Sequence, residues 1–319
     1  MTWFLLTLAC IVLWGIADIL YKAASDPNDP LSHYKSFVWV GIVMALAGGI
    51  MCGWSDTLPS SFRVVMENLY LIPLTILYAL ALFFGLLGIK YLDASVVSTL
   101  ENIDGGMAAI ILCFYFFLTG SRDAAAVVGV LDIIAAVIIV VGVVMLGIQE
   151  QKLYRQGAQF GQDKRKPRLG AVALLFPLLY NLVDAASMAA IGITVSGGAG
   201  ARMPDNDFFI FECLGFVLVA ICVWLYMLIV KKHCYNPFQD GEMVRCGAAT
   251  GETFGTMTFI LAAASKPILT APITSTYCLV TIVLARIFLK ERLTKKQNQG
   301  LGILVLGIAL LGISEIIRA

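Results

Sequence analysis

The sequence is poor in charged residues, in histidine and in catalytic or metal-binding motifs. Asp, Glu, Lys and Arg make up 13% of its 319 residues, whereas soluble proteins hold about a quarter. The net charge is +1, so no nucleic-acid surface is predicted. Its 2 histidines, His33 and His233, are isolated in loops and form no Ser/His or Cys/His catalytic pattern, and no P-loop is present. The 8 cysteines show neither metal nor disulfide spacing. We therefore expect no enzyme, metal site, cofactor or ATP drive.

The sequence is instead rich in long apolar runs. Hydrophobic residues make up 60% of the chain, and about ten runs are long enough to cross the ~30 Å hydrocarbon core of a lipid bilayer. Because lipid-exposed backbone must satisfy its own hydrogen bonds, we expect an all-α integral membrane protein. The runs are Trp3–Tyr21, Phe37–Gly53, Tyr70–Ile89, Ala94–Leu118, Ala124–Ile148, Leu169–Ile193, Phe208–Val230, Val244–Ala264, Pro267–Leu289 and Gly300–Ile317.

Two halves with five runs each resemble one another. The one long polar stretch between runs is 149–168, "QEQKLYRQGAQFGQDKRKPR". Leu13–Asp18 parallels Leu179–Asp184, and Gly142–Ile148 parallels Gly307–Ile313, in the same order. With an odd number of spans per half, the second half must insert upside down, which gives the inverted repeats common in secondary transporters. We therefore predict a first repeat over 1–148, a polar basic linker over 149–168 and a second repeat over 169–319.

Lysine and arginine favour one side of the membrane. The odd-numbered loops hold most of them, including Lys22, Lys35, Lys90, Lys231, Lys232 and the cluster in 152–168. The even-numbered loops hold few beyond Arg63, Arg122, Arg202 and Lys266. Because cytoplasmic loops are enriched in basic residues, we expect the odd loops in the cytoplasm and both termini outside. The membrane we expect is the bacterial cytoplasmic (inner) membrane.

The chain resembles a known transporter family near its end. The segment "LARIFLKERLTKKQNQGLGILVLGIALLGI" resembles the end of the EamA-type domain of the drug/metabolite transporter superfamily, and Leu13-Trp14-Gly15 resembles the start of that domain. The resemblance implies ten helices in two inverted five-helix repeats. It also implies a cavity formed mostly by spans one, three, four, six, eight and nine, with five and ten at the side.

Two features depart from the family pattern. The first half has Thr119-Gly120-Ser121-Arg122 where the second half has Lys290-Glu291-Arg292-Leu293. Matching Phe117-Leu118 to Phe288-Leu289 places Glu101 where the second half has Pro272. Because Glu101 changes the charge of the expected cavity, the resemblance implies the fold but does not fix the substrate class.

Acidic residues deep inside apolar runs are the strongest functional signal. A charge at the bilayer centre costs on the order of 2.5–3.5 kcal/mol on insertion scales, so such residues usually face the protein interior. No lysine or arginine lies at comparable depth except Arg286, which we expect to snorkel or pair locally. The deep acids are Asp18, Glu101, Asp104, Asp184 and Glu252, whereas Asp132, Glu212 and Glu315 lie nearer the ends of runs and are expected to be solvated.

The fourth run holds two of these acids. Ser95, Ser98, Glu101 and Asp104 are spaced by three and would share one face of a continuous helix. Two ionised carboxylates there repel, so a bound cation, a shared proton or a water-filled vestibule is expected. In the alternative interpretation, both acids cap or bridge neighbouring helices through hydrogen bonds.

Asp18 and Asp184 occupy matching positions in the two repeats. Each follows an aromatic residue, Trp14 or Tyr180, by four positions. One interpretation is a symmetric pair of carboxylates facing the cavity. For Asp18 the alternative is an intrahelical ion pair with Lys22, worth about 0.2–0.5 kcal/mol.

Glu252 lies in the eighth run, which is the least hydrophobic. Gly251 and Gly255 beside it permit close packing or a kink. One interpretation is a carboxylate that binds and releases a proton during transport. The alternative is that the helix starts later and that Glu252 lies at the membrane interface.

Polar and aromatic side chains accompany the acids. Thr270, Thr274, Tyr277 and Thr281 form a polar seam at helical spacing in the ninth run. Aromatic faces near carboxylates suit organic ammonium groups through cation–π attraction, worth roughly 0.5–2 kcal/mol, although ordinary helix packing is the alternative. The aromatic residues concerned are Trp14, Tyr180, Phe254 and Tyr277, and Asn181 is expected on the face of Asp184.

The sequence therefore predicts a secondary transporter of a small organic metabolite. We favour a cationic or zwitterionic amine-bearing solute, with protons as a candidate coupling ion. The alternatives are a facilitative channel-like carrier for a neutral metabolite and a membrane enzyme. The Gly-rich fifth and tenth spans predict a packing face for a homodimer. The predicted binding and coupling residues are Trp14, Asp18, Glu101, Asp104, Tyr180, Asn181, Asp184, Glu252, Thr274 and Tyr277.

Overall fold

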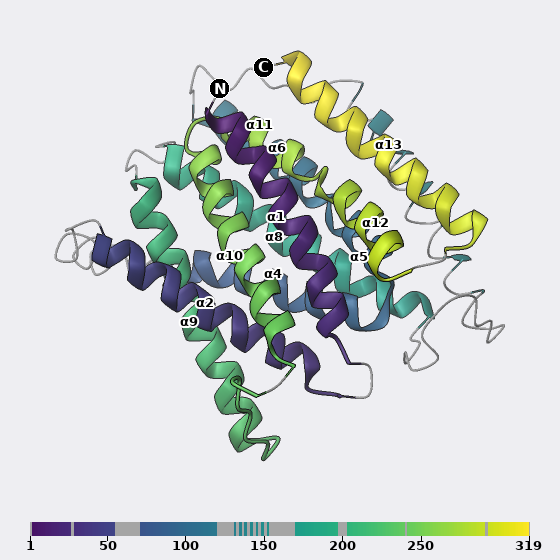
Figure 1. The fold of residues 1–319 in the computed structure, drawn as a ribbon. Helices are drawn as coiled ribbons and strands as arrows, with labels where there is room; N and C mark the ends of the chain where they lie inside the picture. Colours follow the sequence, from purple (N-terminus) through teal and green to yellow (C-terminus); the bar gives the residue numbers. More distant parts are fainter. Residues whose placement is uncertain are drawn as a thin grey trace.

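The computed structural model describes residues 2–26, 29–54, 71–119, 170–196, 203–239, 241–290 and 293–318, with scattered positions between 131 and 152. Within these residues, all regular secondary structure is helical (Figure 1). The predicted linker at 149–168 and most of the fifth predicted run lie outside the described residues. The helices are α1 (Thr2–Ala24), α2 (Ser32–Trp54), α4 (Ile72–Tyr91), α5 (Ala94–Glu101), α6 (Asp104–Leu118), the 3₁₀ helix η2 (Gly170–Leu174), α8 (Leu175–Ser196), α9 (Asp205–Ile229), α10 (Met243–Ala263), α11 (Pro267–Thr274), α12 (Tyr277–Phe288) and α13 (Lys295–Arg318).

Six of the described helical spans are long and apolar enough to cross a membrane. They are α1, α2, α4, the α5–α6 pair, α8 with the end of η2, and α9. Large apolar side chains such as Leu5, Leu46 and Ile229 are more than 60% exposed on their outer faces, where lipid would cover them. The prediction of an all-helical integral membrane protein is confirmed at this level.

Two of the predicted spans are broken in the middle. The fourth run forms α5 and α6, which are separated at Asn102 and Ile103, and the ninth forms α11 and α12, separated at Ser275 and Thr276. In the first break, the Asn102 side chain donates to the carbonyl of Ser98 four residues earlier. Side-chain bonds of this kind compete with the backbone ladder and bend helices. The second break has the same feature.

In the second break, Ser275 donates to the carbonyl of Ala271 at 3.2 Å, and Pro272 has no amide hydrogen for the helix ladder. Glu101 ends the half-helix before the first break, and Thr274 ends the half-helix before the second.

The helices of the two halves pack across each other in a reciprocal pattern. Helix α1 packs against α10 and α12, while α8 packs against α4 and α6. Helices α2 and α9 contact each other directly. The half-helices also cross, since α5 contacts α12 and α6 contacts α11. Figure 1 shows α1 lying beside α10 and α12 near the front of the bundle.

Close helix crossings depend on glycine at two positions near the centre. A Cβ atom on Gly255 of α10 would lie 2.4 Å from Cδ1 of Trp14 on α1. A Cβ atom on Gly105 of α6 would lie 1.9 Å from Oγ of Ser275 at the second break. Both distances are shorter than real carbon contacts, so only glycine permits these helices to approach so closely.

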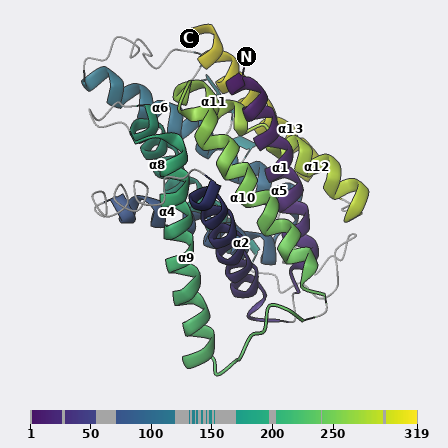
Figure 2. The ribbon, with the colours of Figure 1, turned by 60° about the vertical axis from the view of Figure 1, so that its left-hand side comes forward.

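Helix α13 lies at the edge of the molecule in both views (Figures 1 and 2). It contacts α11 and α5. A Cβ atom on Gly142, in the fifth run, would lie 2.7 Å from Cγ of Leu304 on α13. This glycine therefore packs within the chain, whereas no described atom lies within 4 Å of a Cβ built on Gly302.

Candidate functional site

A small cavity lies where six helices meet near the centre of the bundle. Its volume is about 20 Å³, which suffices for about one water molecule. Its walls come from α1, α4, α5, α8, α10 and α12. The lining residues are Trp14, Asp18, Tyr21, Tyr78, Leu82, Gly85, Leu86, Ile89, Glu101, Tyr180, Glu252 and Tyr277.

The cavity gathers three of the five predicted acids. Asp18, Glu101 and Glu252 line it from three helices that are far apart in sequence. Glu101 and Glu252 are only 3% and 5% exposed. No Lys, Arg or His belongs to its described lining. The arrangement therefore places concentrated negative charge, or the protons that neutralise it, in a site of low dielectric constant.

Asp18 is bound from another helix. Its Oδ2 accepts a hydrogen bond of 3.0 Å from the hydroxyl of Thr281 on α12. The ammonium group of Lys22 donates to the backbone carbonyls of Ile89 and Leu92 at the end of α4. Asp18 thus belongs to the α1–α12 contact and to the cavity.

Glu252 lies deep within the bundle. Helix α10 begins at Met243, so Glu252 is more than two turns inside it. The Tyr78 hydroxyl on α4 donates to Oε1 of Glu252, and the Thr256 hydroxyl lies 3.5 Å from that of Tyr78. Helix α10 therefore starts before Glu252, and the carboxyl group lies buried inside the bundle.

Glu101 ends α5, directly before the break. Its Oε1 atom has no hydrogen-bond partner. A Cβ atom on Gly85 would lie 3.0 Å from that oxygen and 3.1 Å from the ring of Tyr180. The glycine therefore makes room for the carboxyl group, which faces the cavity without a partner that would hold it as a helix cap. This unpartnered oxygen is available to a ligand.

Asp104 and Asp184 form a separate pair outside the lining of the cavity. The sequence places Glu101 and Asp104 on one face only if the helix is continuous. The break at Asn102 and Ile103 interrupts the helical turn, so Asp104 begins a new helix and its side chain interacts with Asp184 on α8. The prediction of a common face for Glu101 and Asp104 is therefore wrong.

The predicted polar residues Asn181 and Thr274 are bonded within the helix framework. The Asn181 amide donates to the carbonyls of Leu100 at 2.7 Å and Pro177 at 2.8 Å. The Thr274 hydroxyl donates to the carbonyls of Thr270 at 3.0 Å and Ala271 at 2.8 Å on its own helix. The break in the ninth span therefore splits the predicted seam, and only its second half, Tyr277 and Thr281, reaches the cavity or Asp18.

Aromatic rings form much of the cavity wall. Trp14 and Tyr277 meet edge to face, with ring centroids 5.8 Å apart, and Tyr180 lines the opposite half. Phe254, which the sequence placed beside these acids, is 47% exposed and points outward. Its neighbour one and a half turns on, Phe259, packs against Trp14 with centroids 5.6 Å apart.

The predicted site residues did not include Tyr21 and Tyr78, and Glu212 was not predicted to be buried. Tyr21 and Tyr78 line the cavity, and their spacing holds a usable signal because Trp14, Asp18 and Tyr21 follow i, i+4, i+7 on one helix face. Glu212 was expected to be solvated, but it is 1% exposed and neither carboxyl oxygen has a partner. Helix α9 starts at Asp205, which places Glu212 about two turns inside.

Two other acids near the ends of runs were also expected to be solvated. Asp132 lies outside the described residues, and so does the side chain of Glu315.

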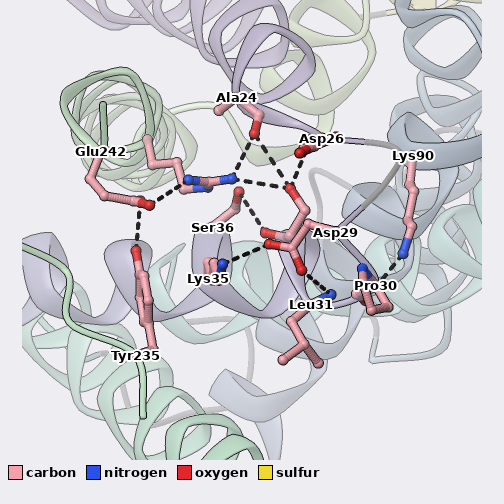
Figure 3. Close-up of polar contacts among 12 residues, drawn as sticks. Ala24, Asp26, Asp29, Pro30, Leu31, Lys35, Ser36, Lys90, Tyr235 and Glu242 are labelled. Atoms are coloured by element: carbon pink, nitrogen blue, oxygen red, sulfur yellow. Dashed lines mark hydrogen bonds and ion pairs between the residues drawn. The ribbon is translucent and has the colours of Figure 1, made fainter. Parts of the chain in front are cut away.

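A network of polar contacts ties loops together at one end of the bundle (Figure 3). Arg245 of α10 forms an ion pair of 2.8 Å with Glu242 and donates to the carbonyl of Ala24 at 2.7 Å. It also donates to the Ser32 hydroxyl at 3.1 Å. The Tyr235 hydroxyl donates to the other Glu242 oxygen at 2.7 Å.

The same end holds a second ion pair. Lys35 of α2 pairs with Asp29 at 2.7 Å, and the Asp29 carboxylate also accepts from the amide of Leu31. Burial raises the pKa of Asp29. The hydrogen bonds from Lys35 and Leu31 and the positive charges of Lys35 and Arg245 lower the pKa by more than burial raises it, so the pKa is below its ordinary value. We call Asp29, Lys35, Tyr235, Glu242 and Arg245 the end network. It joins α1, α2 and α10 at the end where α4 finishes.

The chain was compared with known proteins. No family model and no curated protein matches it. A solved structure described only as "Crystal structure of protein" superposes with a TM-score of 0.57 over 97% of this chain and 96% of its own, at 14% identity. At that identity, the likeness shows a shared fold over nearly the whole length and gives no function.

Proposed function

We propose that this protein is a secondary transporter for a small organic solute that carries an amine, as a cation or a zwitterion. The observation that carries the proposal is the cavity in which Asp18, Glu101 and Glu252 meet without a basic residue in its described lining. An ammonium group would neutralise these carboxylates. The rings of Trp14 and Tyr277 would add cation–π attraction of roughly 0.5–2 kcal/mol each.

The architecture supports transport rather than catalysis. We propose ten spans in two inverted repeats, 1–148 and 169–319. The reciprocal packing supports this, since α1 meets α10 and α12 as α8 meets α4 and α6. Transporters of this design bind solutes between the repeats, beside broken helices. Helices α5–α6 and α11–α12 are broken where they cross.

The resemblance to EamA-type transporters is compatible with the lining of the cavity. In the order of the runs, α1, α4, α5, α8, α10 and α12 belong to spans one, three, four, six, eight and nine. These are the spans that the resemblance implies. Helix α13, from the tenth run, lies at the side. We propose membership of that family on these grounds.

Transport requires the cavity to open. A volume of about 20 Å³ holds about one water molecule and no organic solute, so the cavity must widen before it can bind one. The end network lies on the side of the basic odd-numbered loops, which we place in the cytoplasm. In this proposal the two repeats rock against each other and separate the end network when the cavity opens to that side.

A thermal-shift screen followed by uptake tests the proposal. The purified full-length protein is heated in detergent with choline, putrescine, tetraethylammonium, amino acids, neutral nucleosides and vitamins. A ligand present at 100 times its dissociation constant stabilises by about 2.7 kcal/mol. We expect one or more amines to raise the melting temperature and to enter proteoliposomes. Stabilisation and uptake of neutral compounds alone would favour a facilitative carrier instead.

A further inference from the structure

A second polar centre lies beside the cavity, where α8 packs against the break between α5 and α6. The Asn181 amide of α8 donates to the carbonyl of Leu100, in the last turn of α5. It also donates to the carbonyl of Pro177 on its own helix. Both donor bonds therefore leave from the nitrogen side of the amide, and the oxygen Oδ1 has no partner although Asn181 is 3% exposed.

Two carboxyl groups follow at this junction. Asp184 is one turn beyond Asn181 on α8, and Asp104 is the first residue of α6. They are 0% and 1% exposed, and their side chains are close enough to interact. Oδ1 of Asp104 accepts from the amide of Gly105. No described donor lies in hydrogen-bond geometry with Oδ2 of Asp104 or with either oxygen of Asp184, although the Asp184 carboxyl group also interacts with the Tyr180 hydroxyl.

The neighbouring polar atoms are also unpartnered. Ser187 lies one turn beyond Asp184 and Asn102 lies in the break, and each is 1% exposed. Oγ of Ser187 and Oδ1 of Asn102 make no hydrogen bond. Buried oxygens are rarely left without a partner, because each costs about 1–3 kcal/mol. A ligand at this junction would remove part of that cost.

The charges around the pair identify the ligand. The titratable groups that interact with Asp104 or Asp184 are Tyr78 on α4, Glu101 on α5, Tyr180 on α8, Glu212 on α9, Glu252 on α10 and Tyr277 and Cys278 on α12. Each is a carboxylic acid, a phenol or a thiol, and no Lys, Arg or His is among them. Two ionised carboxylates at such a site would repel with no cation to offset them.

We propose that Asp104 and Asp184 form a proton-binding site, separate from the solute cavity, in which one proton is shared between the two carboxyl groups. The proton comes from water and forms an O–H bond on one carboxylate, and that hydroxyl donates to the other. Release to water breaks the same bond and leaves two carboxylates. No other bond changes. The pair then titrates as one unit.

A proton fits this junction better than a metal ion. The described residues hold no group of three or more His, Cys, Asp and Glu side chains with metal-binding geometry. A single proton provides the O–H···O⁻ bond that the unpartnered oxygens lack, and bonds of that charged kind are among the strongest in proteins. A sodium ion would need several oxygens around it. Infrared spectra at raised Na⁺ distinguish sodium binding from proton binding.

The role of this site rests on the proposed function. Asp104 is separated from the cavity residue Glu101 only by the two residues of the break. Loss or gain of the proton would change the repulsion between α6 and α8, which pack against each other. In a transporter, that change would couple proton movement to the rocking of the repeats. Proton binding itself does not require that the protein transport anything.

Infrared pH-difference spectroscopy of the full-length protein in liposomes tests the site. The carboxylic acid C=O stretching band reports protonated Asp and Glu. We expect the substitution pair Asp104→Asn and Asp184→Asn, made together, to remove about one carboxyl per protein from the titrating band. The matched control, Asp205→Asn with Asp207→Asn in the first turn of α9, makes the same chemical change outside this junction, so the part of the band that the first variant loses should remain in the control. An unchanged band in the first variant would overturn the proposal.

A labelled protein covers the case in which the double variant does not fold. Aspartate ¹³C-labelled at its side-chain carboxyl is incorporated into the Asp18→Asn variant, which removes the cavity aspartate. The titrating band should still shift with the label, since Asp104 and Asp184 remain. A band that does not shift would assign the proton to Glu side chains and reject the site.

Sodium is the competing ligand in the same spectra. Raising Na⁺ at constant pH should leave the carboxylic acid band unchanged. If Na⁺ instead removes the band as alkali does, the pair binds a metal cation and the proton assignment is wrong. No solute is added in any of these measurements, so this inference and the proposed transport function fail separately.

Discussion

The hydroxyl of Tyr78 on α4 donates a hydrogen bond to the carboxyl group of Glu252 on α10. Both side chains line the cavity and both are at most 5% exposed. Tyr78→Phe removes the donor and leaves a buried carboxyl oxygen without it. We expect a loss of about 1–3 kcal/mol in the free energy of unfolding, measured by denaturant or thermal unfolding in detergent.

Tyr21 provides the matched control for Tyr78. Its ring also lines the cavity, but its buried hydroxyl has no hydrogen-bond partner. Tyr21→Phe should therefore be neutral or slightly stabilising. Equal losses in the two variants would show that the tyrosine rings, and not the bond to Glu252, determine the effect.

The crossing of α1 and α10 should be intolerant of any side chain at Gly255. A methyl group there would lie 2.4 Å from Cδ1 and 2.6 Å from Nε1 of Trp14. Because the indole is packed against Phe259 and Tyr277, it has little room to move. We expect Gly255→Ala to destabilise by about 1–3 kcal/mol and to weaken solute binding.

Gly49 on α2 is the control for this change. A Cβ atom there lies more than 4 Å from every atom of the other helices in the part of the chain that the structure describes. Gly49→Ala should stabilise by up to about 1 kcal/mol through helix propensity. A stability of Gly255→Ala equal to wild type, from the same thermal melts, would mean that α1 and α10 are not in this close contact.

The apolar runs allowed the helices to be predicted from the sequence, but not their breaks. Hydropathy averages over a whole run, and Ala94–Leu118 as a whole is apolar enough to be predicted as one span. The break there depends on a side-chain bond from Asn102 to Ser98 and on contacts with α8 such as that of Asn181 with Leu100. Contacts between helices are not visible in a single run. The prediction that Glu101 and Asp104 share a face failed for this reason.

The site could be predicted in part because burial of a charge is expensive whatever its surroundings. That rule selected Asp18, Glu101 and Glu252, which line one cavity. The rule could not show that these three acids line the cavity whereas Asp104 and Asp184 do not, because that difference depends on which helices meet. It also missed Glu212, because the start of α9 at Asp205 lies before the apolar run begins.

Loss of Arg245 should open the end network. Its guanidinium group holds Glu242, the Ala24 carbonyl and Ser32 together, and the residue is 8% exposed. Removing one partner of a largely buried ion pair costs about 3–5 kcal/mol. We expect Arg245→Ala to lower the melting temperature markedly. Cysteines introduced at cavity positions should also react faster with a thiol reagent added from the predicted cytoplasmic side.

Lys231 is the control cation for Arg245. It lies over the ring of Tyr226 at 5.7 Å and its side chain is exposed. Lys231→Ala should leave both measurements near wild type. Equal labelling of the two variants would show that the end network does not keep the cavity closed.

Acid should weaken the end network through Asp29. Because the pKa of Asp29 is lower in the folded protein than its ordinary value of 3.8, the carboxylate favours folding above that value. The contribution is lost as pH falls through the folded pKa, where the carboxylate becomes protonated. We expect wild type to be more stable than Asp29→Asn at neutral pH, and the difference in melting temperature to shrink below about pH 4. A difference that stays constant through this acid range would show that Asp29 acts through its shape or neutral hydrogen bonds.

The charge of Glu101 should decide solute binding. Its Oε1 atom faces the cavity without a partner, so Glu101→Gln keeps the shape and removes the negative charge. A hydrogen bond to a charged group is worth about 1.5–3 kcal/mol, so affinity for a stabilising amine should fall by about 10- to 100-fold and uptake should be lost, while the protein still inserts into the membrane. Asp184→Asn should abolish proton-driven uptake as well, because Asp104 then has no second carboxyl group with which to share the proton. Glu212→Gln makes the same chemical change at an equally buried acid that does not line the cavity, and it should retain binding. If Glu101→Gln binds the amine as wild type does, or if Glu212→Gln weakens it equally, the solute does not meet Glu101.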